Sequence, residues 1–232
     1  MLAIFVILLI SYVLGSIPTS IWVGKITRGV DIRNYGSGNA GATNTFRVLG
    51  WKPGVSVLLI DVAKGYVAAY WVSQLAFYIG SGPVTVPYWN IHSFLSIICG
   101  LVAVVGHMFP FLANFEGGKG MATASGMLIA IEPVSVGITF GVFLIIMIAT
   151  HYVSLASLVA AFIYPLMLLL LRYAFHWSID GSVIIFGAIV GAGIIIKHIG
   201  NIKRLLAGTE SKISSFKLAG GWLGKEQKKS AA

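Results

Sequence analysis

The sequence predicts an all-α protein, a polytopic membrane bundle of seven transmembrane helices with the N-terminus outside and the C-terminus in the cytoplasm. Of the 232 residues, 57% are hydrophobic and only 10% are charged, whereas a soluble domain carries roughly 25% charged residues. Five apolar runs with almost no charge approach or exceed the ~20 residues that a helix needs to cross the hydrocarbon core. The 16 Lys and Arg residues gather in a few loops and at the C-terminal end, which orients the helices.

The first apolar run, Met1–Gly24, carries no charge, and basic residues only follow it. A secretory signal would begin with basic residues, so we interpret this run as a retained helix. The runs Gly65–Tyr88 and Asn90–Phe115 predict the second and third helices. The runs Tyr152–Leu171 and Ile179–Ile196 predict the sixth and seventh.

The segment Met121–Thr150 is too long for one span and contains Glu132-Pro133 in its middle. Proline removes a helical hydrogen bond and clashes with the preceding turn. A single span here would send the basic C-terminal end outside, against the positive-inside rule. Two helices return the chain to the cytoplasm and leave only Arg172 outside. A re-entrant hairpin at 121–150 would give the same sidedness.

The distribution of basic residues sets the predicted topology. Loop 25–53 and the segment 114–120 contain Lys or Arg and are placed inside, whereas loop 80–91 contains none and is placed outside. We assign residues 1–213 to an integral membrane domain and residues 214–232 to a basic cytoplasmic tail. The net charge of +9 then indicates contact with anionic lipid, and we expect no nucleic-acid partner.

Three polar segments face the cytoplasm in this topology, and the first is Asp31–Arg47. Glycine lets the backbone approach a ligand closely and direct successive amides at an anion, and Arg47 could hold a phosphate with two parallel hydrogen bonds. Gly36, Gly38 and Gly41 match Gly-x-Gly-x-x-Gly. That pattern indicates a dinucleotide site only within a βαβ unit, which this chain does not predict. The alternative is a glycine-rich connecting loop without a ligand.

The second segment, Phe115–Gly120, directly precedes a helix expected to begin near Met121. A glycine-rich turn at a helix N-terminus offers free N–H groups and the positive end of the helix dipole, and Lys119 adds a point charge. The segment is not a Walker A loop, because Ala113 and Gly120 occupy positions that require other residues. Generic phosphate binding fits, and a plain turn with an interfacial lysine is the alternative.

The third segment consists of Lys197–Arg204 and Gly208–Lys212. His198 and Asn201 are spaced i, i+3 and share a face if the helix continues, although a basic stretch leaving a helix often serves only to anchor it. Three anion-friendly segments, far apart in sequence, thus converge on one side of the membrane. Their combination indicates a phosphorylated substrate met at the cytoplasmic interface.

Several other polar side chains lie within or beside the apolar runs. Asp61 and Lys64 are spaced i, i+3 and are expected to pair at the start of the second helix, as a functional or a purely structural pair. Ser154 and Ser157 could donate to a bound phosphate, or could bond to their own backbone or a neighbouring helix. The single cysteine, Cys99, allows no intramolecular disulfide and no cysteine-based metal site.

These segments closely resemble the bacterial acyl-phosphate:glycerol-3-phosphate acyltransferases, the PlsY family, over the chain to about residue 213. One departure is Glu116, where many relatives carry a basic residue. The matching motifs are Gly15–Ser20, Gly24-Lys25, Asp31–Arg33, Gly36–Asn44, Arg47, Asp61, Lys64-Gly65, Gly106–Pro110, Gly117–Thr123, Tyr152–Ser157, His198, Asn201, Arg204-Leu205 and Gly208–Glu210.

The resemblance implies a seven-helix enzyme of bacterial phospholipid synthesis in the inner membrane, with its active site facing the cytoplasm. It implies transfer of a fatty acyl group from acyl phosphate to the 1-hydroxyl of glycerol 3-phosphate. The products would be 1-acyl-glycerol 3-phosphate (lysophosphatidic acid) and phosphate. The implied partners are these two substrates and the lipid bilayer, and no cofactor or metal is expected.

The resemblance also implies the site. The catalytic residues would be Ser37, Arg47, Lys119, His198 and Asn201. The substrate-binding residues would be Gly38, Asn39, Gly41, Thr43, Asn44, Gly117, Gly118, Gly120, Ser154, Ser157 and Glu210. Either His198 or a phosphate oxygen of the substrate could accept the hydroxyl proton. Ser37 could accept the acyl group or orient the substrate, and we prefer the orienting role.

Two other classes of protein fit parts of the pattern. A transporter for an organic phosphate would also place basic residues at broken helices, but transporters often contain paired repeats and none is evident here. A purely structural membrane scaffold would leave the Gly/Asn/Ser-rich segment without a role.

Overall fold

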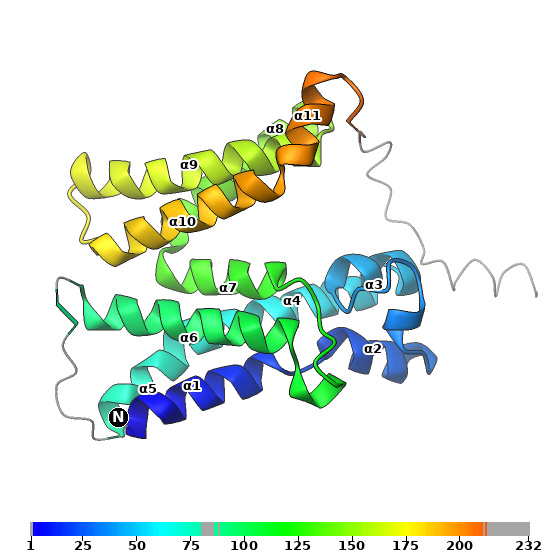
Figure 1. Cartoon of the computed structure of the whole chain (residues 1–232), viewed down its shortest axis with the longest axis horizontal. Coiled ribbons are helices and arrows are strands. Elements are labelled where there is room, and N and C mark those ends of the chain that lie inside the picture. The colour runs from blue at the N-terminus through cyan, green and yellow to red at the C-terminus, as the bar shows by residue number, and fades with distance from the viewer. Residues whose placement is uncertain (1, 80–85, 88, 211, 213–232) are drawn as a thin grey trace, which may run out of the picture. The chain divides into compact units, whose positions relative to one another are not determined.

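The computed structural model describes residues 2–79, 86, 87, 89–210 and 212 (Figure 1). Their regular secondary structure is helical, apart from an isolated bridge between Val86 and Trp89, which confirms the all-α prediction. The chain divides into two compact units. The first comprises the described parts of 1–84 and 95–131, and the second those of 85–94 and 132–216. The predicted tail 214–232 and most of the loop 80–91 lie outside the described residues.

The helices follow one another along the chain with short connections. The first unit contains α1 (Leu2–Gly15), α2 (Thr19–Arg28), η1 (Ile32–Asn34), α3 (Ala42–Leu49), α4 (Trp51–Val67), the π-helix η2 (Ala68–Val72), α5 (Ser73–Tyr78), α6 (Ile91–Met108, in this unit from Leu95 on), η3 (Phe111–Ala113) and α7 (Met121–Ile131). The second contains α8 (Pro133–Thr150), α9 (Val153–Tyr173), α10 (Gly181–Lys197) and α11 (Ile199–Leu206).

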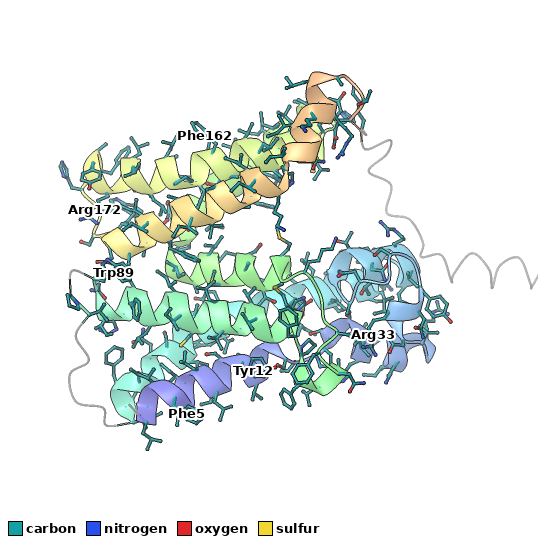
Figure 2. All side chains as sticks on the ribbon, viewed as in Figure 1. Phe5, Tyr12, Arg33, Trp89, Phe162 and Arg172 are labelled. Atoms are coloured by element: carbon teal, nitrogen blue, oxygen red, sulfur yellow. The ribbon has the colours of Figure 1, made fainter. Side chains whose placement is uncertain are left out.

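Five helical stretches among the described residues are long and apolar enough to cross a membrane. They are Leu2–Arg28, Trp51–Tyr78, Ile91–Ala113, Pro133–Thr150 and Val153–Tyr173. The pair α10–α11, bent by 55°, is a sixth candidate, and α7 is a shorter apolar helix. Large apolar side chains such as Phe5 on α1 and Phe162 on α9 are exposed (Figure 2), as lipid-facing residues would be. Seven crossings and their sidedness stay predictions.

The break predicted at Glu132-Pro133 is confirmed. Helix α7 ends at Ile131 and α8 begins at Pro133. The Glu132 carboxylate accepts a hydrogen bond from the Ser135 amide and so caps α8. Proline suits the first position of a helix, where its missing N–H would have no partner anyway.

The second predicted helix was placed wrongly, because it begins at Trp51 rather than near Asp61. We expected charged side chains to mark the membrane boundary. Instead, Asp61 and Lys64 lie buried inside α4 and pair with each other, so that the helix extends ten residues further toward the N-terminus. Pairing removes much of the penalty that would otherwise exclude two charges from this environment.

Small residues let the helices of the first unit approach closely, a common device in membrane helix packing. Helices α4 and α7 cross where a side chain at Gly65 would collide with the Thr123 carbonyl, and one at Gly126 with the Val62 carbonyl. In the second unit, α9 packs against α8 and α10, and a side chain at Gly191 would meet the α9 backbone.

Candidate functional site

The first glycine-rich segment is a compact turn built around one buried amide side chain. Asn44 Oδ1 accepts from the Ser37 amide (2.9 Å), and Asn44 Nδ2 donates to the carbonyls of Ile32 (3.1 Å) and Tyr35 (2.9 Å). Gly36 has φ +63°, and a side chain there would collide with the Asn44 amide. The Asn44 side chain is therefore fully occupied in shaping the turn, and any part in substrate binding would act through that shape.

The second half of this segment forms a helix that we did not predict from the sequence. Helix α3 begins after Gly41 and carries Thr43, Asn44 and Arg47. A small core beneath it, made by residues of α2, η1, α3 and the connecting turns, holds the turn and the helix together; its buried residues are Ile21, Ile32, Ala40, Val48, Leu49 and Ala113.

The predicted side chains of this segment differ in exposure. Ser37, Gly38, Thr43 and Arg47 are exposed, whereas Asn39 is half-buried. Within the described part of the chain, Arg47 has no ion-pair partner. A serine hydroxyl, a threonine hydroxyl and a guanidinium are thus presented on one short turn-and-helix unit, as an anion site requires.

The second glycine-rich segment folds back onto the end of α6. The Gly117 amide donates to the Met108 carbonyl (3.2 Å) and the Gly118 amide to the His107 carbonyl (3.1 Å). We expected these two amides to cradle phosphate, but they are already used. Gly120, at φ +77°, turns the chain into α7, which begins at Met121 as predicted. The N–H groups left for an anion are those of the first turn of α7.

Lys119 projects from this turn as an exposed ammonium without an ion-pair partner in the part of the chain that the structure describes. A point charge beside a helix N-terminus strengthens the local attraction for an anion. The combination of Lys119 and the start of α7 matches the arrangement that the sequence predicted.

Arg33, which we did not predict as a site residue, joins the two segments (Figure 2). It donates to both Asp31 carboxylate oxygens (3.1 and 2.8 Å), to the Ala113 carbonyl (3.2 Å) and to Glu116 Oε2 (3.2 Å). The hydrogen bonds from Arg33 lower the pKa of Asp31, and Asp31 in turn raises the pKa of Arg33. Glu116, the departure from the family pattern, is thus a partner of this arginine.

The second unit holds the remaining predicted residues, and there the sequence interpretation needs a correction. The helix does not continue straight through His198, which ends α10 and precedes α11 at a bend of 55°. The His198 Nδ1 atom lies 2.8 Å from the Ile194 carbonyl oxygen. His198 and Asn201 therefore belong to different helical segments and do not share one continuous helical face.

Asn201 and Glu210 are brought together by the turn after α11. Asn201 Nδ2 donates to Glu210 Oε1 (2.8 Å), and Arg204 Nε donates to Glu210 Oε2 (2.7 Å). The hydrogen bond from Asn201 is the main cause that lowers the pKa of Glu210, with Arg204 adding to it. The carboxylate thus orients the two side chains of the motif, and the spacing of nine residues concealed this contact from sequence reasoning.

The two serines of α9 lie at its start. Ser157 Oγ donates to the Val153 carbonyl (2.9 Å), the backbone bond that was the structural alternative at the sequence level. Ser154 is buried. In the same unit, Lys212 lies over the Tyr152 ring, 5.1 Å from its centroid, which brings the segment after α11 back to the beginning of α9.

Each unit therefore gathers its own part of the predicted site. The first holds Ser37, Gly38, Asn39, Gly41, Thr43, Asn44, Arg47, Gly117, Gly118, Lys119 and Gly120; the second holds Ser154, Ser157, His198, Asn201 and Glu210. Among the described residues, no three His, Cys, Asp or Glu side chains group as metal ligands.

Long apolar helices, with polar residues gathered in glycine-rich turns at their ends, define an integral membrane protein with an anion-directed polar site. A family model described as Glycerol-3-phosphate acyltransferase matches residues 5–208. The chain belongs to this glycerol-3-phosphate acyltransferase family, and it is a membrane enzyme that acylates glycerol 3-phosphate.

Curated relatives and solved structures agree with this family. The glycerol-3-phosphate acyltransferase of Salinibacter ruber is 45% identical, covering 97% of this chain and 99% of its own. That of Chlorobaculum tepidum is 46% identical, covering 92% and 98%. The crystal structure of PlsY (YgiH), an integral membrane glycerol 3-phosphate acyltransferase in its glycerol 3-phosphate form, is 36% identical, with a TM-score of 0.67 and coverage of 91% and 96%. Its lysophosphatidic acid form has a TM-score of 0.68.

Proposed function

We propose that the acyl donor is acyl phosphate and that the products are 1-acyl-glycerol 3-phosphate and inorganic phosphate. In this reaction, the 1-hydroxyl oxygen of glycerol 3-phosphate forms an ester bond with the acyl carbon, and the bond from that carbon to the phosphate oxygen breaks. The hydroxyl proton leaves with the released phosphate. The carrying observation is that two tied glycine-rich turns each present an exposed, unpaired cation, Arg47 and Lys119.

Two phosphate groups would meet such a site, one on each substrate. Acyl phosphate is already activated, so the enzyme needs mainly to hold the two substrates and to stabilise developing charge. We assign Arg47 and Lys119 to the phosphates, and Ser37 to orienting the glycerol moiety. His198 or a phosphate oxygen of the substrate would accept the hydroxyl proton, and the Glu210-oriented Asn201 would bind a substrate oxygen.

We also propose that the chain crosses the membrane seven times, with the N-terminus outside, the C-terminus inside and the active site at the cytoplasmic face of the bacterial cell membrane. The exclusion of basic residues from the outer loops supports this arrangement. Residues 1–213 would form the catalytic membrane domain and residues 214–232 a basic tail that contacts anionic lipid.

The donor is tested by measuring phosphate release from acyl phosphate with purified protein. We expect release only when glycerol 3-phosphate is added, with an equal amount of lysophosphatidic acid formed. Release without the acceptor, or acylation from a thioester donor alone, would contradict the proposal. A sealed-vesicle assay addresses the transporter alternative, since a transporter would move intact glycerol 3-phosphate without acyl phosphate.

A further inference from the structure

A cluster of three buried ionisable side chains lies beneath the second glycine-rich turn and takes no part in the chemistry proposed above. Asp61 and Lys64 come from α4 and His107 from the last turn of α6, and they are only 1%, 3% and 7% exposed. Burying charges in a membrane protein is costly, and such residues are usually functional. We call these three residues the buried charge cluster.

The cluster is held together by short contacts. Lys64 Nζ lies 2.9 Å from Asp61 Oδ1 and donates to the Ile17 carbonyl (3.1 Å), in the break between α1 and α2. His107 Nδ1 lies 3.6 Å from the same Asp61 oxygen. Asp61 therefore faces both an ammonium and one edge of the imidazole ring, which limits how the His107 ring can turn.

The other edge of the His107 ring touches the turn that carries Lys119. A side chain at Gly118 would collide with His107 Nε2, and the Gly118 amide donates to the His107 carbonyl (3.1 Å). Gly118 thus fits against both the backbone and the ring of His107. A shift of the ring must displace Gly118, and Lys119 is the next residue along the chain.

We propose that His107, oriented by the Asp61–Lys64 pair, is a positioning residue that sets the Gly117–Gly120 turn and thereby the Lys119 ammonium against a substrate phosphate. This inference rests on the proposed role of Lys119 as a phosphate clamp. The cluster touches no substrate group itself. Its effect on the reaction is transmitted through contacts with Gly118.

The test is a pair of double-mutant cycles on purified enzyme, with kcat and KM measured for both substrates. His107→Leu removes both polar edges of the ring and is expected to lower kcat/KM roughly 10-fold to 100-fold, the size of effect that a small misplacement of a catalytic group produces. Combined with Lys119→Arg, the loss should be much less than the product of the single losses. Combined with Arg47→Lys on the other segment, the losses should multiply.

Two further variants address folding and chemistry. His107→Asn keeps a donor toward Asp61 and should recover part of the lost activity. If His107→Leu fails to fold, Asp61→Asn with Lys64→Met removes both buried charges together, so that neither is left unpaired. This pair should reproduce the coupling to Lys119→Arg, with an unfolding temperature near that of the wild type.

The outcomes separate the two proposals. Losses that multiply with both Lys119→Arg and Arg47→Lys would show a general structural effect and overturn the positioning role. Wild-type kinetics in His107→Leu would overturn it as well. Unchanged kinetics in Lys119→Arg and in Lys119→Ala would instead overturn the phosphate clamp of the proposed function. Coupling confined to Lys119 supports the inference.

Discussion

Arg47 and Lys119 carry exposed positive charges on two turns whose backbones are held by buried side chains. We predict that Arg47→Ala and Lys119→Ala each lower kcat/KM at least about a hundredfold, because each removes charge stabilisation in the transition state. Neither side chain packs in the core, so thermal unfolding of the purified variants should match the wild type. Wild-type turnover in either folded variant would refute the clamp assignment.

Asp31 and Arg33 predict a dependence of stability on pH. The pKa of Asp31 is lowered from its ordinary value of 3.8 by the hydrogen bonds from Arg33. The ion pair therefore stabilises the fold fully above about pH 3.8, and this contribution is lost as the pH falls through the lowered pKa. We expect Asp31→Asn to reduce stability by about 1 kcal/mol or less at neutral pH.

The measurement is thermal unfolding of wild type and Asp31→Asn in detergent over a range of pH. The difference between them should shrink as the pH falls below 3.8. Glu116→Gln is the matched control on the same arginine, because the Glu116 side chain is 75% exposed and its ion pair should contribute little. A constant difference at all pH values would mean that Asp31 acts through packing rather than charge.

At the level of the helices, the crossing of α4 and α7 determines where the second turn begins, and it depends on glycine. We predict that Gly126→Ala lowers stability by about 1–3 kcal/mol, since a Cβ there would collide with the Val62 carbonyl and the backbones would have to separate. Gly141→Ala on α8 is the control, because a Cβ there meets no other atom within 4 Å.

Thermal unfolding and kinetics of the two variants check this prediction. Gly126→Ala should also lose activity, because α7 starts immediately after the turn that carries Lys119. Equal stability of the two variants would contradict the close approach of α4 and α7. The same close approach through small residues recurs between α1 and α6, where a side chain at Gly15 would collide with the Ala103 carbonyl.

For the whole molecule, the predicted sidedness can be measured with introduced cysteines. Ser81→Cys lies in the loop predicted to be outside, and Ser230→Cys in the predicted cytoplasmic tail. A membrane-impermeant maleimide should label Ser81→Cys in intact cells, and Ser230→Cys only after permeabilisation. The parent protein is the control, because its single cysteine, Cys99, is buried. The reverse labelling pattern would invert the proposed topology.

The sequence by itself determined the class of structure, because long uncharged runs and a one-sided distribution of Lys and Arg have few other solutions in water or in a membrane. It also determined the two breaks that depend on local chemistry, at Glu132-Pro133 and before Met121. The residues presented on the turns, such as Ser37, Arg47 and Lys119, were predicted because glycine-rich motifs keep their character over short distances.

Only the tertiary structure decided what depends on contacts between distant parts of the chain. The beginning of α4 was misplaced because Asp61 and Lys64 satisfy each other inside the helix. The roles of Asn44 and Arg33 depend on carbonyls and carboxylates that no local pattern identifies. A charged residue can end a helix or lie buried within one, and the energetic balance between these outcomes depends on the partner that the folded chain supplies.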